Sequence, residues 1–581
     1  MSLRNPTRAL AAALVLLTAS ALLAAPASAA KAFDFTRAPN VNTGFDPVVQ
    51  NIANRPAMLI ETNYYAYGPG TGFTDPQVIL TVEANGNPGP VTLYVYWHDR
   101  VTGAQLFYNG VLGFTAVETD VFGVPGAPLQ ITLGDLDDFK LFGDDSAFGP
   151  LPNDIPVTTG RYQFVAEVRD SVGATTLART NALYNWVDGV ETHGGSLAVS
   201  ERWRSNMLHY IESPLYVEEG ATLTVDRGTM VAASTAGQGT LIIRQGAAID
   251  AVGAPIDPIV FTSELEVGDR SPGAWGGMVI NGLAPTNRGT DPLPEGEGDS
   301  GPYGGSDADD SSGRLSYVRL EFAGIRFSEQ NELNGIAFQG VGRGTQIDHI
   351  QVHRNQDDGV EFFGGTADAK YLLMTGCHDD SLDWTDGWTG RVQYFAAVQF
   401  ANDEQDQGIE ADNLEDDQDA LPRSSPDIRN ATFIGDAITS APLATDEGNL
   451  IRLGTQVTMN NAVIAHFTNF GVNIDGATSQ SFLGGNGTSY DNVILFGNAG
   501  GASNRPLAQL GSNISTADPG FFNSPIGRDG GGVVPDLCFA NGQQNGNPGS
   551  GAFFDRAPFI GAIDCGNSDW TQTGWTTWSD N

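Results

Sequence analysis

Acidic residues recur at fixed positions in a short phrase that is repeated between residues 334 and 454. The phrase reads Asn334-Gly-Ile-Ala-Phe-Gln, Asp358-Gly-Val-Glu-Phe-Phe, Asp380-Ser-Leu-Asp-Trp-Thr, Gln407-Gly-Ile-Glu-Ala-Asp and Asn449-Leu-Ile-Arg-Leu-Gly. Its third and fifth positions are mostly apolar. The fourth position holds Ala337, Glu361, Asp383, Glu410 and Arg452. Because side chains two apart along a strand share a face, the apolar positions should point inward and the fourth position outward.

Strands that stack in register would place the carboxylates of Glu361, Asp383 and Glu410 above one another, about 4.8 Å apart. Further acids crowd the corner that precedes each strand. Like charges at this spacing cost free energy unless a cation, a proton or an arginine lies between them. Carboxylate oxygens are the ligands that Ca²⁺ prefers. We therefore expect a calcium site, with the ligands Asp357, Asp358, Glu361, Asp379, Asp380 and Asp383.

Two other interpretations of the same carboxylates stay open. Glu361, Asp383 and Glu410 could share the acid and base roles of a glycoside hydrolase. Trp384 and Trp388 would then offer sugar-stacking faces, although we expect Trp384 to pack inward instead. The sequence contains neither the Asp-Asp, Gly-His-Gly and Arg-Ile-Lys pattern of polygalacturonases nor the Arg-x-Pro-x-x-Arg of pectate lyases. The third interpretation is a surface protein whose long solenoid face binds a partner without catalysis. For the calcium site itself, the alternative is a hydrated acidic surface that holds no ion.

The elements that would position these residues are strands, because a repeat of about 20–30 residues without a helical pattern predicts a solenoid. We expect an all-β chain in two folded units. An immunoglobulin-like β-sandwich would span residues 31–195, and a right-handed parallel β-helix would span residues 205–581. Acidic insertions interrupt the coil at 286–313 and 410–426, and the first could fold over the acidic strands. Residues 570–578 are candidates for a C-terminal cap.

Several phrases resemble secreted bacterial right-handed parallel β-helix repeat proteins, which work at the cell surface or outside the cell. They include Pro258-Ile-Val-Phe-Thr-Ser, Gly273-Ala-Trp-Gly-Gly-Met-Val-Ile-Asn-Gly, Asp357-Asp-Gly-Val-Glu-Phe-Phe-Gly-Gly and Asp379-Asp-Ser-Leu-Asp-Trp. The likeness covers about two thirds of the chain. It implies the β-helix fold. Together with the acidic surface and the export signal, we expect an extracellular polysaccharide or another surface component as partner.

The net charge excludes two classes of partner, and the N-terminal residues predict where the protein works. The formal charge of -40 repels nucleic acid and anionic membranes and attracts divalent cations. Residues 1–30 have the basic start, apolar run and Ala27-Ser-Ala site of a cleaved signal peptide, so we expect a secreted or cell-surface protein. No later stretch is apolar enough to span a membrane. In an oxidising compartment Cys538 and Cys565 should form a disulfide, which leaves Cys377 as a buried thiol.

Overall fold

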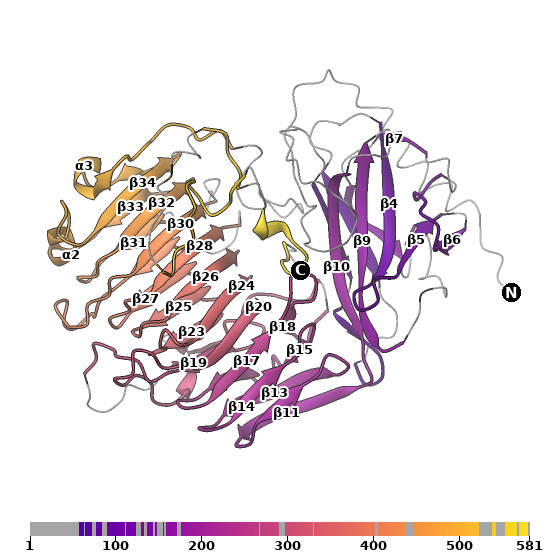
Figure 1. Ribbon diagram of the computed structural model, residues 1–581, viewed down its shortest axis with the longest axis horizontal. Helices are drawn as coiled ribbons and strands as arrows, with labels where there is room; N and C mark the ends of the chain where they lie inside the picture. Colours follow the sequence, from indigo (N-terminus) through magenta and orange to yellow (C-terminus); the bar gives the residue numbers. More distant parts are fainter. Residues whose placement is uncertain are drawn as a thin grey trace.

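The structure is a computed structural model of an almost entirely β chain with a two-sheet unit followed by a long coil of strands (Figure 1). It describes residues 57–62, 64–71, 77–83, 90–110, 112–123, 129–132, 136–142, 146–147, 155, 158–170, 176–266, 268–289, 297–328, 331–400, 405–436, 446–521, 537–541, 546, 552–565 and 569–578. The predicted signal peptide at 1–30 lies outside these residues.

Two sheets build the N-terminal unit, and they share one hydrophobic core. The smaller sheet has the order β1 (Ala57–Thr62), β3 (Val78–Glu83) and β8 (Leu136–Phe142). The larger sheet has the order β2 (Ala66–Tyr67), β10 (Thr176–Trp186), β9 (Gly160–Asp170), β4 (Pro90–Asp99), β5 (Gln105–Asn109) and β6 (Gly113–Thr115), with β7 (Ile131–Thr132) beside β4. Pairing is antiparallel except between β2 and β10. The immunoglobulin-like class of this unit stays a prediction.

The second unit is a single 24-stranded sheet wound into a parallel β-helix, which confirms the predicted solenoid. Its first strands are β11 (Val190–Leu197), β12 (Glu201–Trp203), β13 (Leu208–Val217), β14 (Thr222–Val225), β15 (Met230–Ala233), β16 (Thr240–Ile243), β17 (Ala248–Val252), β18 (Ile259–Ser263) and β19 (Gly277–Asn281). A continuous column of buried aliphatic and aromatic side chains fills the interior. Burial of this apolar surface is the main stabilising term. The right-handed sense stays a prediction.

From β20 onward, long bent strands alternate with short straight ones. The bent strands are β20 (Gly313–Glu321), β24 (Gln346–His353), β26 (Ala369–Thr375), β28 (Arg391–Val398), β30 (Asp427–Ile434), β32 (Thr458–Ala465) and β34 (Ser489–Phe496). The short strands are β23 (Ile336–Gln339), β25 (Val360–Phe363), β27 (Leu382–Thr385), β29 (Ile409–Ala411), β31 (Asn449–Ile451), β33 (Phe470–Ile474), β35 (Gly501–Ser503) and β36 (Gly511–Ser512). Strands β16, β19, β23, β25, β27, β29, β31, β33 and β35 pair in that order; we call them the short-strand ladder.

Each bent strand turns at one residue that adopts a left-handed backbone conformation. Tyr371 has φ +57°, and the equivalent residues of the other bent strands are similar. We call this column the corner ladder; its members are Tyr317, His349, Tyr371, Tyr394, Asn430, Asn461 and Asn492. The aromatic members stack: ring centroids are 4.1 Å apart for Tyr317 and His349, 4.3 Å for His349 and Tyr371, and 4.5 Å for Tyr371 and Tyr394.

The described C-terminal residues, 537–541, 546, 552–565 and 569–578, lie along the side of the coil that carries the corner ladder, and we call them the strap. This position corrects the predicted role of residues 570–578 as an end cap. Trp570 packs edge-on against Tyr371 of β26, and Trp575 packs edge-on against Tyr317 of β20. Figure 1 shows the C-terminus between the two units, whereas α2 (Ala477–Ser481) and α3 (Leu507–Leu510) lie at the far end. The sequence did not distinguish the two roles, because aromatic residues that pack on the side of a coil look the same in sequence as those that cover its end.

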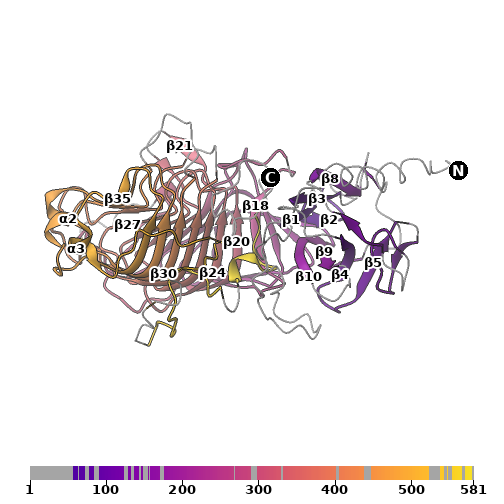
Figure 2. The same cartoon turned by 90° about the horizontal axis from the view of Figure 1, so that it is seen from above.

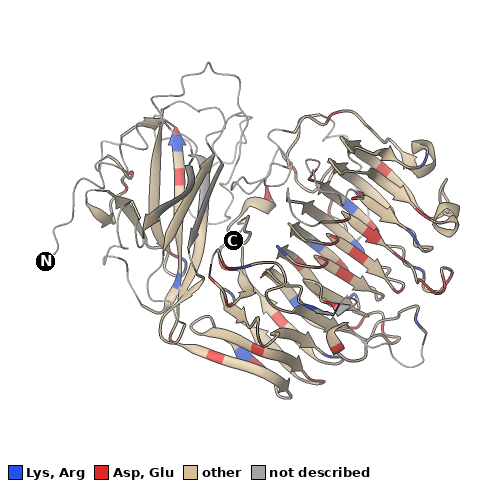
Figure 3. Cartoon of the chain, turned by 180° about the vertical axis from the view of Figure 1, so that it is seen from behind, with Lys and Arg blue, Asp and Glu red and all other residues tan. Residues whose placement is uncertain are grey.

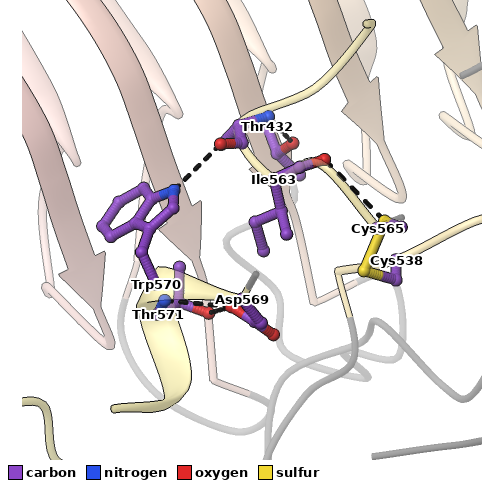
Figure 4. Close-up of a disulfide and its surroundings, with 8 residues drawn as sticks. Thr432, Cys538, Ile563, Cys565, Asp569, Trp570 and Thr571 are labelled. Atoms are coloured by element: carbon purple, nitrogen blue, oxygen red, sulfur yellow. Dashed lines mark hydrogen bonds between the residues drawn. A yellow bond between two sulfur atoms is a disulfide. The ribbon is translucent and has the colours of Figure 1, made fainter. Parts of the chain in front are cut away.

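A disulfide between Cys538 and Cys565 holds the strap together, and its Cα atoms are 5.5 Å apart. Nearby, the Ala562 N–H donates to Thr432 Oγ1 of β30, and Trp570 Nε1–H donates to the Ala562 carbonyl (Figure 4). The 3-10 helix η3 (Trp570–Gln572) follows. Cys377 is buried within the coil, and burial raises the pKa of its thiol to about 12, so it is an unreactive thiol.

The coil begins earlier than the predicted boundaries at residues 195 and 205. Strand β11 already pairs in parallel with β13, from Val190 opposite Leu208 to Leu197 opposite Val217. Its sequence, Val-Glu-Thr-His-Gly-Gly-Ser-Leu, has almost no apolar alternation, since β11 stands at the edge of the sheet and buries little surface. The first coil therefore lacks the hydrophobic pattern that marks the later ones.

Candidate metal centre

The outward face of the short-strand ladder changes from apolar to acidic along the coil. Ile242, Val279 and Ala337 occupy successive outward positions, and Leu333 packs over them. The next strands place Glu361 opposite Ala337, Asp383 opposite Glu361, and Glu410 opposite Asp383. The predicted stack of three carboxylates is therefore confirmed. In Figure 3 acidic positions recur on neighbouring strands of the coil.

Seven carboxylates meet on this part of the surface, which we call the acidic face: Asp357, Asp358, Glu361, Asp379, Asp380, Asp383 and Glu410. They form three trios whose oxygen atoms lie within 4.8 Å of one another. The trios are Asp357, Asp358 and Asp379; Asp358, Glu361 and Asp383; and Asp380, Asp383 and Glu410. The oxygens of one trio are close enough to surround one cation at the Ca–O distance of about 2.3–2.6 Å.

The acids at the first position of the phrase also connect successive coils. Asp358 Oδ1 accepts the backbone N–H of Asp380 at 3.0 Å, and Asp380 Oδ1 accepts that of Gln407 at 2.6 Å. Gln407 Oε1 in turn accepts the N–H of Glu447 at 2.6 Å. This position needs a hydrogen-bond acceptor rather than a charge, which is why amide side chains substitute for acids there.

At the fourth position of the phrase, on β27, one oxygen atom of the Asp383 carboxylate has no hydrogen-bond partner in the described residues. Asp383 is half-buried, and its Oδ1 atom is inaccessible to solvent and accepts no hydrogen bond from the described part of the chain. A buried, unpaired carboxylate oxygen is costly. Asp383 also belongs to two of the three trios, so a cation at either would satisfy this oxygen.

Burial and mutual repulsion raise the pKa values of six carboxylates of the acidic face. Burial, then the charge of Asp379, raises the pKa of Asp357 to about 8. Burial, then Asp406, raises the pKa of Asp379 to about 6. The pKa of Glu410 rises to about 7, mainly through burial and against the attraction of Arg452. Burial and neighbouring carboxylates also hold the pKa values of Asp358, Asp380 and Asp383 well above the usual range.

A β-hairpin and an ion-paired arginine border the acidic face. On one side, the hairpin of β21 (Arg326–Ser328) and β22 (Asn331–Glu332) projects from the coil (Figure 2), and Arg326 pairs with Glu332. On the other, Arg452 pairs with Glu410 and donates from Nε to Asp412 Oδ1 at 2.8 Å. Repeat spacing gave no sign of Glu332 or Asp412, because neither lies in a repeated strand: Glu332 belongs to β22 of the hairpin, and Asp412 follows the end of β29.

The first insertion packs beside the acidic face rather than across it. Among its described residues, 286–289 and 297–313, Tyr303 donates its hydroxyl to Asp386 Oδ2 at 2.7 Å, and Arg288 pairs with the same carboxylate. Ser300 contacts Gln339 on the outer side of β23, next to the 3-10 helix η1 (Glu297–Asp299). The insertion thus covers the apolar part of the ladder.

The fifth phrase begins two residues earlier than its sequence pattern predicts, at Glu447 instead of Asn449. Ile409 lies opposite Asn449, and Glu410 lies opposite Leu450, so Leu450 rather than Arg452 occupies the outward position. A shift of two residues leaves the inside-outside alternation of a strand unchanged, and for that reason the hydrophobic pattern did not reveal it. The column of outward carboxylates ends at Glu410.

Both tryptophans considered as sugar platforms lie in the hydrophobic interior. Trp384 and Trp388 have no exposed surface. Trp384 donates its indole N–H to Thr455 Oγ1, and Trp388 donates its own to the Ala367 carbonyl. The expectation that Trp384 packs inward is therefore confirmed, and the expected role of Trp388 in stacking against a sugar is wrong, because a buried indole cannot reach a ligand outside the coil.

The fold and the stacked carboxylates define a parallel β-helix protein with an acidic, cation-competent face. Residues 189–509 match the family described as the pectate-lyase like beta helix domain, and this match covers more than half of the 581 residues. The chain belongs to this family. No curated protein matches the sequence.

Similar solved structures include the catalytic unit of a thermostable GH87 alpha-1,3-glucanase from Streptomyces thermodiastaticus strain HF3-3. It is 11% identical, and the alignment covers 77% of this chain and 88% of that chain with a TM-score of 0.24. The catalytic domain of a GH87 alpha-1,3-glucanase in complex with tetrasaccharides is 9% identical, with 80% and 89% coverage and a TM-score of 0.22. None of the helices in the described residues has the length and apolar character that crossing a membrane requires.

Proposed function

We propose that the protein is an exported, calcium-binding β-helix protein whose acidic face recognises an extracellular polysaccharide or another surface component. The unpaired Oδ1 atom of Asp383, at the junction of two carboxylate trios, carries the proposal. An acidic cluster that served only hydration would expose its oxygens to water. Here the shared carboxylate is half-buried among others that burial keeps difficult to ionise.

Calcium suits the face for reasons of charge and coordination. Ca²⁺ takes about 6–8 oxygen ligands, so a trio of carboxylates satisfies part of its shell and leaves positions for other oxygens. Polysaccharides present hydroxyl and carboxylate oxygens at high density. With a formal charge of -40, the protein would repel an anionic polymer unless cations stood between them. The proposed ligands are Asp357, Asp358, Glu361, Asp379, Asp380 and Asp383, joined by Glu410.

The test compares calcium-dependent melting of the whole protein with that of Asp383→Asn. We expect Ca²⁺ to raise the melting temperature of the unaltered protein, because a ligand that binds only the folded state stabilises it. The increase should largely disappear in Asp383→Asn. Asp416→Asn, at an exposed acid in the second insertion, is the matched control and should keep the full increase. Equal calcium responses in all three proteins would refute the site.

Polysaccharide recognition needs its own measurement. We expect binding to a glycan panel in the presence of Ca²⁺ and loss of binding in chelator. Asp383→Asn should lose the same glycans, whereas Asp416→Asn should retain them. Calcium binding without any glycan signal would contradict the partner while leaving the metal site intact.

A polysaccharide hydrolase is the second candidate, and one observation favours it. Glu410 has a pKa of about 7, as a general acid near neutral pH requires, and its oxygens lie within 4.8 Å of those of Asp383. Together with Glu361 these residues would be the catalytic groups. Sugar release from the same panel, abolished in Glu410→Gln with melting unchanged, would identify the hydrolase. Binding without release would identify the calcium-dependent binder.

A further inference from the structure

A second cluster of metal-ligand side chains lies at the start of the coil, on its first two rungs. Glu191 and His193 project from the same side of the edge strand β11, two residues apart. His209 of β13 lies directly opposite Glu191 in the parallel pair. One nitrogen of each histidine and one oxygen of Glu191 lie within 4.8 Å of one another. The repeated phrase does not reveal this cluster, because its residues lie on the first strands of the coil, before the phrase begins.

Hydrogen bonding determines which nitrogen of His209 bears the lone pair. His209 Nε2 lies 3.2 Å from the carbonyl oxygen of Arg204, which can only accept, so Nε2 carries the hydrogen. The Nδ1 atom of this buried ring therefore presents its lone pair to His193 Nε2 at 3.0 Å and to Glu191 Oε2 at 3.6 Å. A backbone carbonyl that fixes the tautomer in this way is typical of metal-ligating histidines.

Neither neutral tautomer of His193 satisfies its surroundings. With hydrogen on Nε2, the ring donates to His209 but turns the lone pair of Nδ1 toward Glu201 Oε1 at 3.5 Å. With hydrogen on Nδ1, the ring faces Glu201 favourably, but the lone pairs of the two histidines then oppose each other at 3.0 Å. A cation between the two rings removes the conflict, because it accepts both lone pairs.

We propose that Glu191, His193 and His209 form a transition-metal site of the Zn²⁺ class, separate from the acidic face. Two imidazole nitrogens and a carboxylate suit Zn²⁺, whereas Ca²⁺ prefers oxygen ligands alone. Zn–N bonds of about 2.0–2.1 Å at a tetrahedral angle separate two nitrogens by roughly 3.3 Å, close to the observed 3.0 Å. Three protein ligands leave the fourth position to water.

The surroundings of the cluster hold the ligands in place. The buried indole of Trp203 stacks on both rings, with centroids 4.4 Å from His193 and 4.9 Å from His209. Its Nε1–H donates to Glu201 at 2.9 Å, so the same tryptophan also positions the carboxylate that faces His193. Metal here would join the edge strand to the coil.

The experiment measures Zn²⁺ binding to the metal-free whole protein by calorimetry in excess Ca²⁺, which occupies the acidic face. We expect one tight Zn²⁺ per chain and a higher melting temperature. Glu191→Gln, at an exposed position that should not affect folding, should weaken binding about tenfold or more, and His193→Gln should abolish it. Asp383→Asn is the control and should bind Zn²⁺ normally.

Three results would overturn the proposal. Absence of tight Zn²⁺ binding would do so, as would binding that survives both His193→Gln and Glu191→Gln. Zn²⁺ binding lost in Asp383→Asn would assign the ion to the acidic face instead. Replacing Zn²⁺ with Co²⁺ adds an independent readout, because nitrogen ligation changes its visible absorption spectrum. That spectrum should disappear in His193→Gln and persist in Asp383→Asn.

Discussion

Individual carboxylates of the acidic face differ in what they contribute. Asp358 and Asp380 accept backbone N–H groups of the next coil, so part of their role is structural. Asp383 and Glu410 stand on the outward side of their strands, and within the described part of the chain neither accepts a backbone N–H of the next coil. Substitutions at the two kinds of position should therefore differ: loss of Asp380 should lower stability directly, whereas loss of Asp383 should mainly lower cation binding.

The raised pKa values predict how stability depends on pH without metal. Unfolded Asp and Glu titrate near pH 4, whereas Asp379, Glu410 and Asp357 titrate near 6, 7 and 8 in the folded protein. Between these limits the folded state binds more protons than the unfolded state, so stability falls as pH rises. We expect the melting temperature in chelator to decrease from about pH 4 to about pH 8. Saturating Ca²⁺ should flatten the decrease.

Melting curves at several pH values, with and without Ca²⁺, provide the measurement. Asp383→Asn removes one buried charge and should show a smaller decrease in chelator. Asp416→Asn is the exposed control and should follow the unaltered protein. A melting temperature in chelator that rises over this pH range would show that the carboxylates are stabilised as anions.

At this scale the sequence predicted which acids meet but not how they are used. Repeat spacing was sufficient to stack Glu361, Asp383 and Glu410, since strand pairing translates sequence period into position. The bonds from Asp358 and Asp380 to the next coil depend on corner geometry, which spacing does not describe. The contact of Arg452 with Glu410 and Asp412 was likewise hidden by the misaligned fifth phrase.

At the scale of the element, the corner ladder sets the shape of each coil. Tyr371 stacks between His349 and Tyr394 while its backbone has φ +57°. Asparagine occupies the same position in later coils, because it tolerates the left-handed conformation better than most residues. The bends therefore depend on two separate properties, aromatic stacking and tolerance of a positive φ.

Two substitutions of Tyr371 should separate these properties. Tyr371→Asn removes two stacked pairs and should lower the free energy of unfolding by about 1–3 kcal/mol. Tyr371→Val removes the same pairs and adds a β-branched residue at positive φ, which should cost about 1–3 kcal/mol more. Urea unfolding of both variants measures the difference. Equal losses would show that the backbone conformation adds no strain.

The positive φ values could not be predicted from the sequence. A tyrosine or histidine within a strand pattern normally indicates an extended residue, and only glycine marks a left-handed bend reliably. The ladder became visible only when the register placed Tyr317, His349 and Tyr371 at the same corner. The hydrophobic alternation predicted the faces of the strands correctly on either side of each bend.

At the scale of the whole molecule, buried ion pairs fix the two-sheet unit to the coil. Asp257, which precedes β18, contacts Arg100 Nη1 at 2.9 Å and Arg161 Nε at 2.8 Å. Arg100 and Asp257 are buried, and both arginines belong to the two-sheet unit. Core residues of the coil, including Met230 and Val260, join the hydrophobic core of that unit. We therefore expect the two units to unfold together.

The substitution Asp257→Asn should uncouple the unfolding of the two-sheet unit from that of the coil. Removing one partner leaves the buried Arg100 charge uncompensated, which costs about 3–5 kcal/mol in comparable sites. In calorimetry we expect the two-sheet unit to unfold at a lower temperature, in a transition separate from the unfolding of the coil. Asp250→Asn, which breaks an exposed pair with Arg314, is the matched control and should change stability by less than about 1 kcal/mol. A single unshifted transition in Asp257→Asn would contradict the coupling.

Composition and periodicity predicted the all-β class and the solenoid, since both follow from local residue patterns. The strap and the ion pairs at Asp257 depend on contacts between residues far apart in the chain. Trp575, for example, accepts a hydrogen bond at its carbonyl from Arg319, 256 residues earlier. No periodic signal connects such partners, so the strap was expected at an end of the coil.

The shared membership of Asp383 in two trios has a consequence for occupancy. A cation bound at one trio withdraws a ligand from the neighbouring trio and places a positive charge about one rung away. Asp358 links the third trio in the same way. Successive ions should therefore bind with negative cooperativity, and the face would respond to calcium over a broad concentration range instead of switching at a single threshold.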